Sequence, residues 1–154
     1  MKKKLLFCGL FLFVAVFMLT GCGLNKITAE DFKRMAEEDG LTVSDITSSY
    51  SSYSYIKKIY IAKHSNGWKV EFYELDSEEK ATQIYTTNKN KFLSSSPSTN
   101  SSSSTLTTDQ GERYSLTVNG YYKHVCRIGD TFVYANINAD YKEEAIKFLK
   151  KIGY

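Results

Sequence analysis

The last third of the chain contains three short segments of alternating apolar and polar residues, which span 114–118, 121–128 and 131–137. Two-residue turns separate them, Asn119-Gly120 and Gly129-Asp130, and such pairs adopt the backbone angles of tight hairpins. Parallel strands need a crossover of a dozen or more residues, so these neighbours must run antiparallel. This pattern constrains the fold more than any other part of the sequence, because it predicts an antiparallel meander.

One face of the predicted meander is apolar. Residues that oppose each other across the second turn share one side of the sheet with every second residue of their strands. Six residues fall on that side: Tyr122, Cys126, Ile128, Val133, Ala135 and Ile137. We expect this face to pack against helices of the chain.

The first part of the domain begins with a helix and continues with strands. Thr28 as N-cap and Gly40 as a left-handed stop predict a helix over 29–39. A short strand over 41–46 follows. The β-branched and aromatic segments 55–62 and 68–75 are then joined by a turn at His64-Ser65-Asn66-Gly67, which predicts a hairpin.

Capping residues mark two further helices. Asp76 or Ser77 is expected to cap a second helix with an apolar stripe that includes Ala81, Ile84, Tyr85 and Phe92. Asp140 and Glu143 have the spacing of a capping box, which predicts a final helix over 141–151.

These elements predict an α+β fold, with an antiparallel sheet of hairpins and a meander and about three helices packed on one face. An offset of 64 residues aligns the two strand-turn-strand-helix units of the chain. The alignment suggests a duplicated ββα unit, although a cap and an apolar stripe are common to any such unit.

The chain of 154 residues suits a single domain, which we expect to span 27–154. Ser and Thr occupy 12 of the 15 positions in 94–108. Such a segment buries too little apolar area to offset the entropy lost on ordering, so we expect a flexible loop there.

Residues 1–21 have the features of an export signal. Three lysines precede a nearly unbroken apolar run over 5–19, which spans only about 22 Å as a helix against a hydrocarbon core of about 30 Å. A short run behind lysines is typical of a signal peptide rather than a transmembrane helix.

The charge balance follows from removing this segment. The whole chain has 20 basic and 17 acidic side chains, and without the three lysines of the signal the two numbers are equal. This equality rules out the strongly basic balance that a nucleic-acid-binding protein would show.

The signal ends in Leu19-Thr20-Gly21-Cys22, which resembles the bacterial lipobox. The resemblance implies that Cys22 receives a diacylglyceryl group and that cleavage occurs between Gly21 and Cys22, which leaves 22–26 as a lipidated tether. Two acyl chains hold a protein at a membrane where one chain is marginal. The resemblance thus implies a lipid anchor at the extracytoplasmic face of the cell membrane.

Few residues suggest catalysis, and we expect no catalytic residue, metal or cofactor. Cys8 precedes the cleavage point and Cys22 is implied to carry lipid, so Cys126 has no disulfide partner and is expected to be a small buried residue. His124 lies on the same strand side as Cys126, and His64 lies beside a turn. Neither has a metal-ligand spacing such as HExxH, so we expect an inert His124 in the core and a solvated His64.

Three of the 12 tyrosines, Tyr50, Tyr53 and Tyr55, stand among serines before the hairpin. Exposed tyrosines among small polar residues make adaptable contacts with proteins or sugars. We therefore take these three as a candidate binding surface for an envelope protein or a glycan, although tyrosine also suits half-buried strands.

Beyond the lipobox, the chain resembles small lipoproteins of Gram-positive bacteria, in which a helix opening like 27–32 (ITAEDF) follows the lipidated cysteine. This resemblance implies no particular activity or oligomeric state. We expect a non-catalytic binding or accessory module of the cell envelope. A second interpretation is a small cell-envelope hydrolase that uses His124 with a serine or with Cys126.

The first prediction concerns the anchor. Mass spectrometry of the membrane fraction should find a diacylglyceryl-modified peptide that begins at Cys22, because the lipobox places the modified residue at the new N-terminus. Cys22→Ala should release the protein or leave an unprocessed precursor. An unmodified Cys22 inside an uncleaved chain would contradict this expectation.

Overall fold

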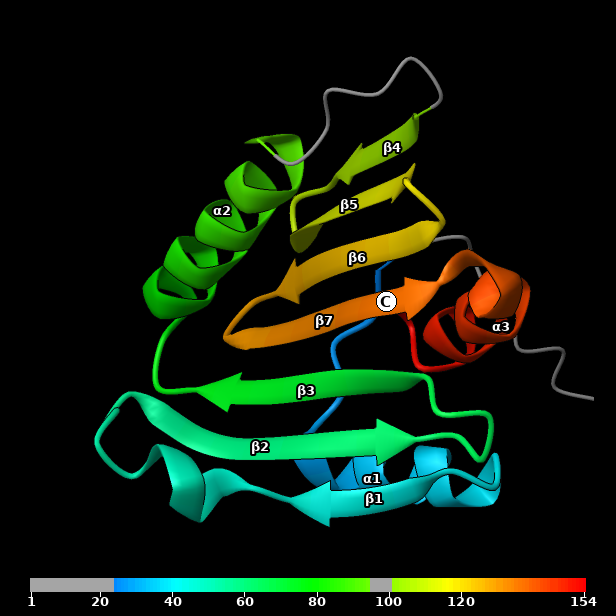
Figure 1. Cartoon of the computed structure of the whole chain (residues 1–154). Coiled ribbons are helices and arrows are strands. Elements are labelled where there is room, and N and C mark those ends of the chain that lie inside the picture. The colour runs from blue at the N-terminus through cyan, green and yellow to red at the C-terminus, as the bar shows by residue number, and fades with distance from the viewer. Residues whose placement is uncertain (1–23, 95–100) are drawn as a thin grey trace, which may run out of the picture.

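The structure is a computed structural model that describes residues 24–94 and 101–154, so the predicted signal segment, Gly21 and Cys22 lie outside the described residues. The chain has an α+β fold, with a seven-stranded antiparallel sheet and three helices packed against it (Figure 1). The predicted fold class is confirmed. The helices and strands are, in chain order, α1 (Ala29–Glu38), β1 (Thr42–Asp45), β2 (Ile56–Lys63), β3 (Lys69–Leu75), α2 (Glu78–Ser94), β4 (Ser102–Thr107), β5 (Gly111–Val118), β6 (Tyr121–Ile128), β7 (Thr131–Asn138) and α3 (Lys142–Lys151).

The strands lie in the order β1-β2-β3-β7-β6-β5-β4. After β3, α2 carries the chain to the far side of the sheet, where β4 forms the edge (Figure 1). From there β5, β6 and β7 return strand by strand until β7 pairs with β3, with Val70 opposite Ala135. The predicted meander is therefore confirmed, and its last strand joins the two halves of the sheet.

Local signals at the first helix and at the first meander turn act as predicted. The Thr28 hydroxyl accepts a hydrogen bond from the Asp31 backbone N–H at 3.1 Å, which caps α1. Gly40 has a φ of 78° after the helix, and Asn119 and Gly120 have positive φ values of 51° and 76°. These left-handed residues end the helix and close the β5–β6 hairpin.

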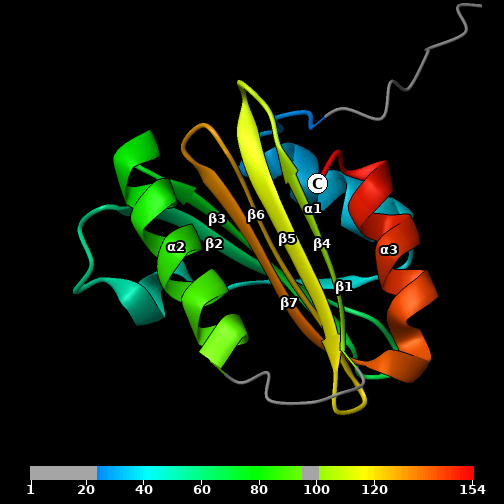
Figure 2. The ribbon, with the colours of Figure 1, turned by 90° about the horizontal axis from the view of Figure 1, so that it is seen from above.

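The helices lie on both faces of the sheet. α1 and α3 pack on one face and α2 packs on the other (Figure 2). Alternate residues of β7 point to the two sides, so Val133 lies in the core under α1 and α3 whereas Phe132 lies in the core under α2. All six residues of the predicted apolar face belong to the core under α1 and α3, as expected.

The expectation of helices on a single face is wrong. Central strands carry large apolar side chains at both alternating positions, as Phe132 and Val133 illustrate, so both faces of the sheet need a cover. The two ββα units also send their helices to opposite faces. Two copies of a duplicated unit that meet as antiparallel neighbours would be related by a twofold axis perpendicular to the sheet. Rotation about that axis leaves each helix on the same face of the sheet. Because the two helices lie on opposite faces, the described elements lack the symmetry of a duplicated unit.

The start of the last helix also differs from the expected capping box. A short 3₁₀ turn, Ala139–Tyr141, precedes α3, and the Asn138 side chain accepts from the Asp140 N–H at 3.0 Å. Asp140 therefore lies inside this turn rather than at the N-cap, and Tyr141 is the N-cap of α3 without a side-chain hydrogen bond.

The Ser/Thr-rich segment is not a loop throughout. Residues 95–100 lie outside the described part, but Ser102–Thr107 forms β4, which pairs residue by residue with β5. The prediction of a flexible loop over the whole of 94–108 is therefore wrong. An edge strand is held by backbone hydrogen bonds to one neighbour, which Ser and Thr residues provide without an apolar face of their own.

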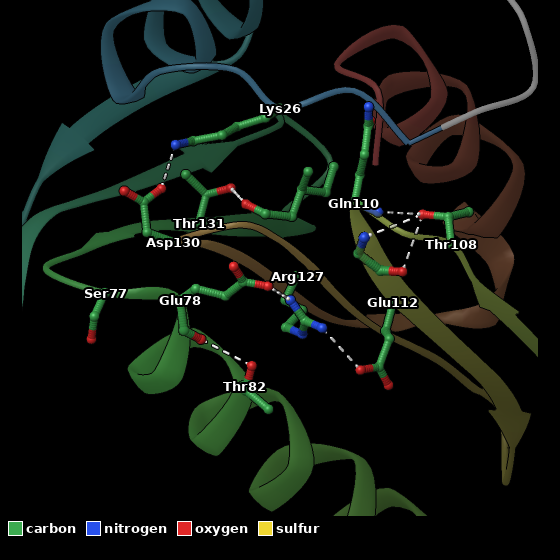
Figure 3. A network of polar contacts seen from close by, with 12 residues as sticks. Lys26, Ser77, Glu78, Thr82, Thr108, Gln110, Glu112, Arg127, Asp130 and Thr131 are labelled. Carbon is green, nitrogen blue, oxygen red and sulfur yellow. Dashed lines mark hydrogen bonds and ion pairs between the residues drawn. The ribbon is translucent and has the colours of Figure 1, made fainter.

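The N-terminal residues of the described part are fixed to the domain. Leu24 is only 6% exposed, the Asn25 N–H donates to the Gly153 carbonyl at 2.9 Å, and Lys26 pairs with Asp130 at 2.6 Å (Figure 3). The expected lipidated tether over 22–26 is therefore corrected for 24–26, which pack on the domain. Among the described residues, no helix has the length and hydropathy needed to cross a membrane.

The second prediction tests β4. Replacing Thr105, Leu106 and Thr107 together by glycine should lower the free energy of unfolding by about 1–3 kcal/mol, because glycine has low strand propensity and half-buried Leu106 loses its packing. Urea denaturation measures the loss. An unchanged stability, together with free-peptide rates of amide hydrogen exchange in 102–107, would favour the loop after all.

Candidate functional site

A cavity of about 290 Å³ lies between α3 and the outer strands β4–β6, on the face that α1 and α3 cover. We call it the α3 pocket. Its lining comprises three cations, several hydroxyl groups, one imidazole and an apolar wall, contributed by Arg113, Lys142, Lys150, Ser102, Ser103, Ser104, Ser115, Thr117, Tyr122, His124, Ile146, Leu149 and Tyr154.

The polar floor of the pocket follows from the alternation of β5. Tyr114 and Leu116 point into the core under α2, so Arg113, Ser115 and Thr117 point to the opposite side. The apolar face of the meander therefore continues into a polar strip at β5. This strip lies where the sheet extends beyond α3.

The wall of the pocket is one side of α3. Lys142, Ile146, Leu149 and Lys150 are four, three and one residues apart, which places them on one helix face. Two lysines thus flank an apolar patch that faces the polar strip. Helical spacing explains why these four residues line one cavity.

The charge in the pocket has one sign. Its lining contains Arg113, Lys142 and Lys150 but no Asp or Glu. None of the three cations forms an ion pair with any residue that the structure describes, whereas Arg127 pairs with both Glu78 and Glu112 (Figure 3). The Nζ of Lys142 lies over the face of the Tyr122 ring, 5.8 Å from its centroid. The α3 pocket is therefore a positively charged site.

His124 lies at the inner end of a hydroxyl network. It is 2% exposed, and its Nδ1 lies 3.0 Å from Ser115 Oγ and 3.2 Å from the Tyr122 hydroxyl. The Tyr122 hydroxyl donates to Ser115 Oγ, and Ser115 can in turn donate to Nδ1; this arrangement places the ring hydrogen on Nε2. Nε2 is buried and has no hydrogen-bond partner among the described residues.

The electrostatic environment keeps this imidazole neutral. Burial, with a further contribution from the Arg113 charge, lowers the pKa of His124 from 6.5 to about 3. At neutral pH the ring is therefore a hydrogen-bonding group and a very weak base. The expectation of a buried, hydrogen-bonded His124 is confirmed, but the residue also lines a cavity.

Cys126 is a buried core residue, as expected. It is fully buried under α1 and α3, and this burial raises the pKa of its thiol to about 12. It does not line the α3 pocket. The structure thus brings Ser115 and His124 together, and it leaves the thiol outside their network.

His64 is half-buried rather than solvated. Its ring stacks on Trp68 with centroids 5.1 Å apart, and Trp68 Nε1 donates to Glu144 at 3.1 Å. A second cavity of about 230 Å³ lies here, lined by His64, Trp68 and five further residues: Asp39, Leu41, Glu144, Lys147 and Phe148. No three His, Cys, Asp or Glu side chains gather as metal ligands in the described ranges.

The three candidate tyrosines do form a cluster. Ring centroids are 6.2 Å apart for Tyr50 and Tyr53 and 5.8 Å apart for Tyr53 and Tyr55. Tyr53 is 48% exposed, whereas Tyr55 packs on the core under α2 and contacts Lys80. The cluster lies on the α2 side of the sheet, away from the α3 pocket.

Sequence reasoning missed the residues that charge the α3 pocket. The alternation of Arg113, Ser115 and Thr117 in β5, and the spacing of Lys142 and Lys150 on α3, are visible in the sequence. That these two patterns face each other is not visible, because β5 and α3 meet only through the sheet order.

Comparison with protein-family models, curated proteins and solved structures finds no match to this chain.

The third prediction concerns His124 and pH. The unfolded chain binds a proton at an ordinary imidazole near pH 6.5, whereas the folded chain does so only near pH 3, so acid favours unfolding between these values. From pH 7 to pH 5, the wild type should lose about 2 kcal/mol more free energy of unfolding than His124→Gln. Urea denaturation at both pH values measures this difference, and equal losses would contradict the buried neutral imidazole.

Proposed function

We propose that the chain is a lipid-anchored module at the extracytoplasmic face of the cell membrane, which binds a small ligand in the α3 pocket without transforming it. The anchor part rests on the lipobox at Leu19-Thr20-Gly21-Cys22. The binding part rests on one observation, a cavity lined by cations and hydroxyl groups with a neutral buried imidazole.

The donor set suits binding better than catalysis. A general base needs a pKa near the working pH, and the lowered pKa of His124 is far from that range. A catalytic cysteine needs a thiolate, and the raised pKa of Cys126 disfavours one. No Asp or Glu side chain in the pocket lining orients His124 or stabilises its charged form.

A hydrolase is the second candidate, because one observation favours it. Ser115 Oγ lies 3.0 Å from His124 Nδ1, which is the contact that a serine nucleophile makes with its base. In this site, however, the Tyr122 hydroxyl also points to Nδ1 and donates to Ser115 Oγ at 3.3 Å. The serine is thus one member of a hydroxyl network around a weak base, which favours a structural role.

Short spacing would keep the domain close to its anchor. Leu24 is buried against the domain, and it lies two positions after Cys22, a reach of about 7 Å when extended. The hydrogen bond from Asn25 to Gly153 places the N-terminal end of the described chain beside Tyr154, which lines the α3 pocket. The proposed lipid anchor would therefore hold this end of the pocket near the membrane surface.

The fourth prediction separates binding from hydrolysis. Ser115→Ala should restore most of any phenotype lost in a deletion strain, because a binding site loses one hydrogen bond, worth about 1 kcal/mol. Arg113→Gln should fail to restore it, because the pocket loses its guanidinium. Complementation at several expression levels measures both. A folded, anchored Ser115→Ala protein that behaves like the deletion would favour the hydrolase.

A further inference from the structure

We infer that the α3 pocket binds a phosphate-ester group of a small organic molecule, with Arg113, Lys142 and Lys150 as its counter-charges. This inference rests on the proposed binding function and names the chemical class of the ligand. Four features of the pocket carry it: the net charge, the free hydrogen-bond donors, the apolar wall and the size.

The charge of the site fits a dianion. Three cations line the cavity without an ion-pair partner in the described part of the chain, and no Asp or Glu side chain lines it. A phosphate monoester carries about −1.5 to −2 charges at neutral pH, whereas a carboxylate carries one. Arginine matches the geometry of phosphate oxygens and lysine acts as a point charge on them.

Neutral donors are also free for such a group. The buried Nε2 of His124 has no partner among the described residues, and the network on Nδ1 assigns it a hydrogen. A buried donor without a partner costs stability, so an acceptor that binds there is favoured. Phosphate oxygens are strong acceptors and can use this N–H together with the hydroxyl of Thr117 in the β5 strip.

The remaining wall suits an organic body. Ile146, Leu149 and Tyr154 form the apolar part of the lining. A volume of about 290 Å³ lies at the lower end of ligand pockets, which excludes a bulky or polymeric ligand from full entry. The pocket thus pairs an anion site with room for a small apolar group.

The second cavity provides an internal contrast. Asp39 and Glu144 line it together with Lys147, so its cation is offset by acids. We therefore expect a phosphate group to bind in the α3 pocket and not in the second cavity, where the acids would repel it. Lys147 lies on α3 as Lys142 and Lys150 do, which makes it a matched control for charge removal.

At the extracytoplasmic face of the membrane, a phosphate ester can belong to one of two sources, a soluble metabolite or a lipid headgroup. Glycerol 3-phosphate represents the first source. Dihexanoylphosphatidylglycerol, a water-soluble lipid, represents the second. Both compounds contain the phosphate ester that we infer. The ability of each compound to displace a bound phosphate ester distinguishes the natural source.

The fifth prediction tests the ligand class by calorimetric titration of the full-length protein in non-ionic detergent. Phenyl phosphate should bind at least about tenfold more tightly than benzoate, which has one charge, and benzyl alcohol should not saturate the site. Arg113→Gln and the double variant Lys142→Gln/Lys150→Gln should each weaken phenyl phosphate binding at least about tenfold, and Lys147→Gln less than about twofold. Melting curves verify that each variant is folded.

An independent readout follows His124. In protein labelled with ¹⁵N-histidine, phenyl phosphate should shift the Nε2 resonance, because the N–H gains an acceptor. Displacement of phenyl phosphate by glycerol 3-phosphate alone would assign a soluble ligand, and displacement by the short lipid would assign a headgroup. Either result supports phosphate recognition.

Other outcomes would overturn the inference. If benzyl alcohol bound as tightly as phenyl phosphate, or if Lys147→Gln weakened binding as much as Arg113→Gln, charge would not select the ligand, although the proposed binding function would stand. Failure of phenyl phosphate and both competitors to bind at millimolar concentration would also overturn it. The complementation test with Ser115→Ala then decides the binding function separately.

Discussion

The antiparallel pairing of β3 with β7 is the contact on which the rest of the structure depends. It joins the first hairpin to a strand that follows it by more than fifty residues, with Phe72 opposite Val133. This pairing forces the intervening chain to cross the sheet through α2 and to return through the meander. Because both strands carry apolar side chains on both faces, the pairing also requires helices on both faces.

The width of the sheet explains where the pocket forms. Seven strands about 4.8 Å apart span about 29 Å between the two edges, whereas two packed helices cover about 20 Å. On the face of α1 and α3 the outer strands β4 and β5 therefore extend beyond the helices (Figure 1). Their side chains on that face are polar, as Ser104 and Ser115 illustrate, and α3 supplies the opposing wall.

Ion pairs add contacts at the ends of elements that the core also holds. Arg127 links the first turn of α2, through Glu78, to β5, through Glu112, and so fixes the crossover helix to the meander (Figure 3). Lys26 with Asp130 holds the N-terminal segment against the β6–β7 turn. These cations are neutralised locally, whereas Arg113, Lys142 and Lys150 have no ion-pair partner among the residues that the structure describes.

The sequence by itself determined the local structure: α1 with its Thr28 cap and Gly40 stop, both hairpins and the meander, because each depends on neighbouring residues. It also placed Cys126 in the core, and the lipobox at Cys22 stays a prediction. The tertiary structure decided the helix faces, the strand β4 and the α3 pocket. Each of these needs the sheet order, since an edge strand such as β4 is stabilised by its partner β5, and Arg113 meets α3 only across a sheet closed by β3 and β7.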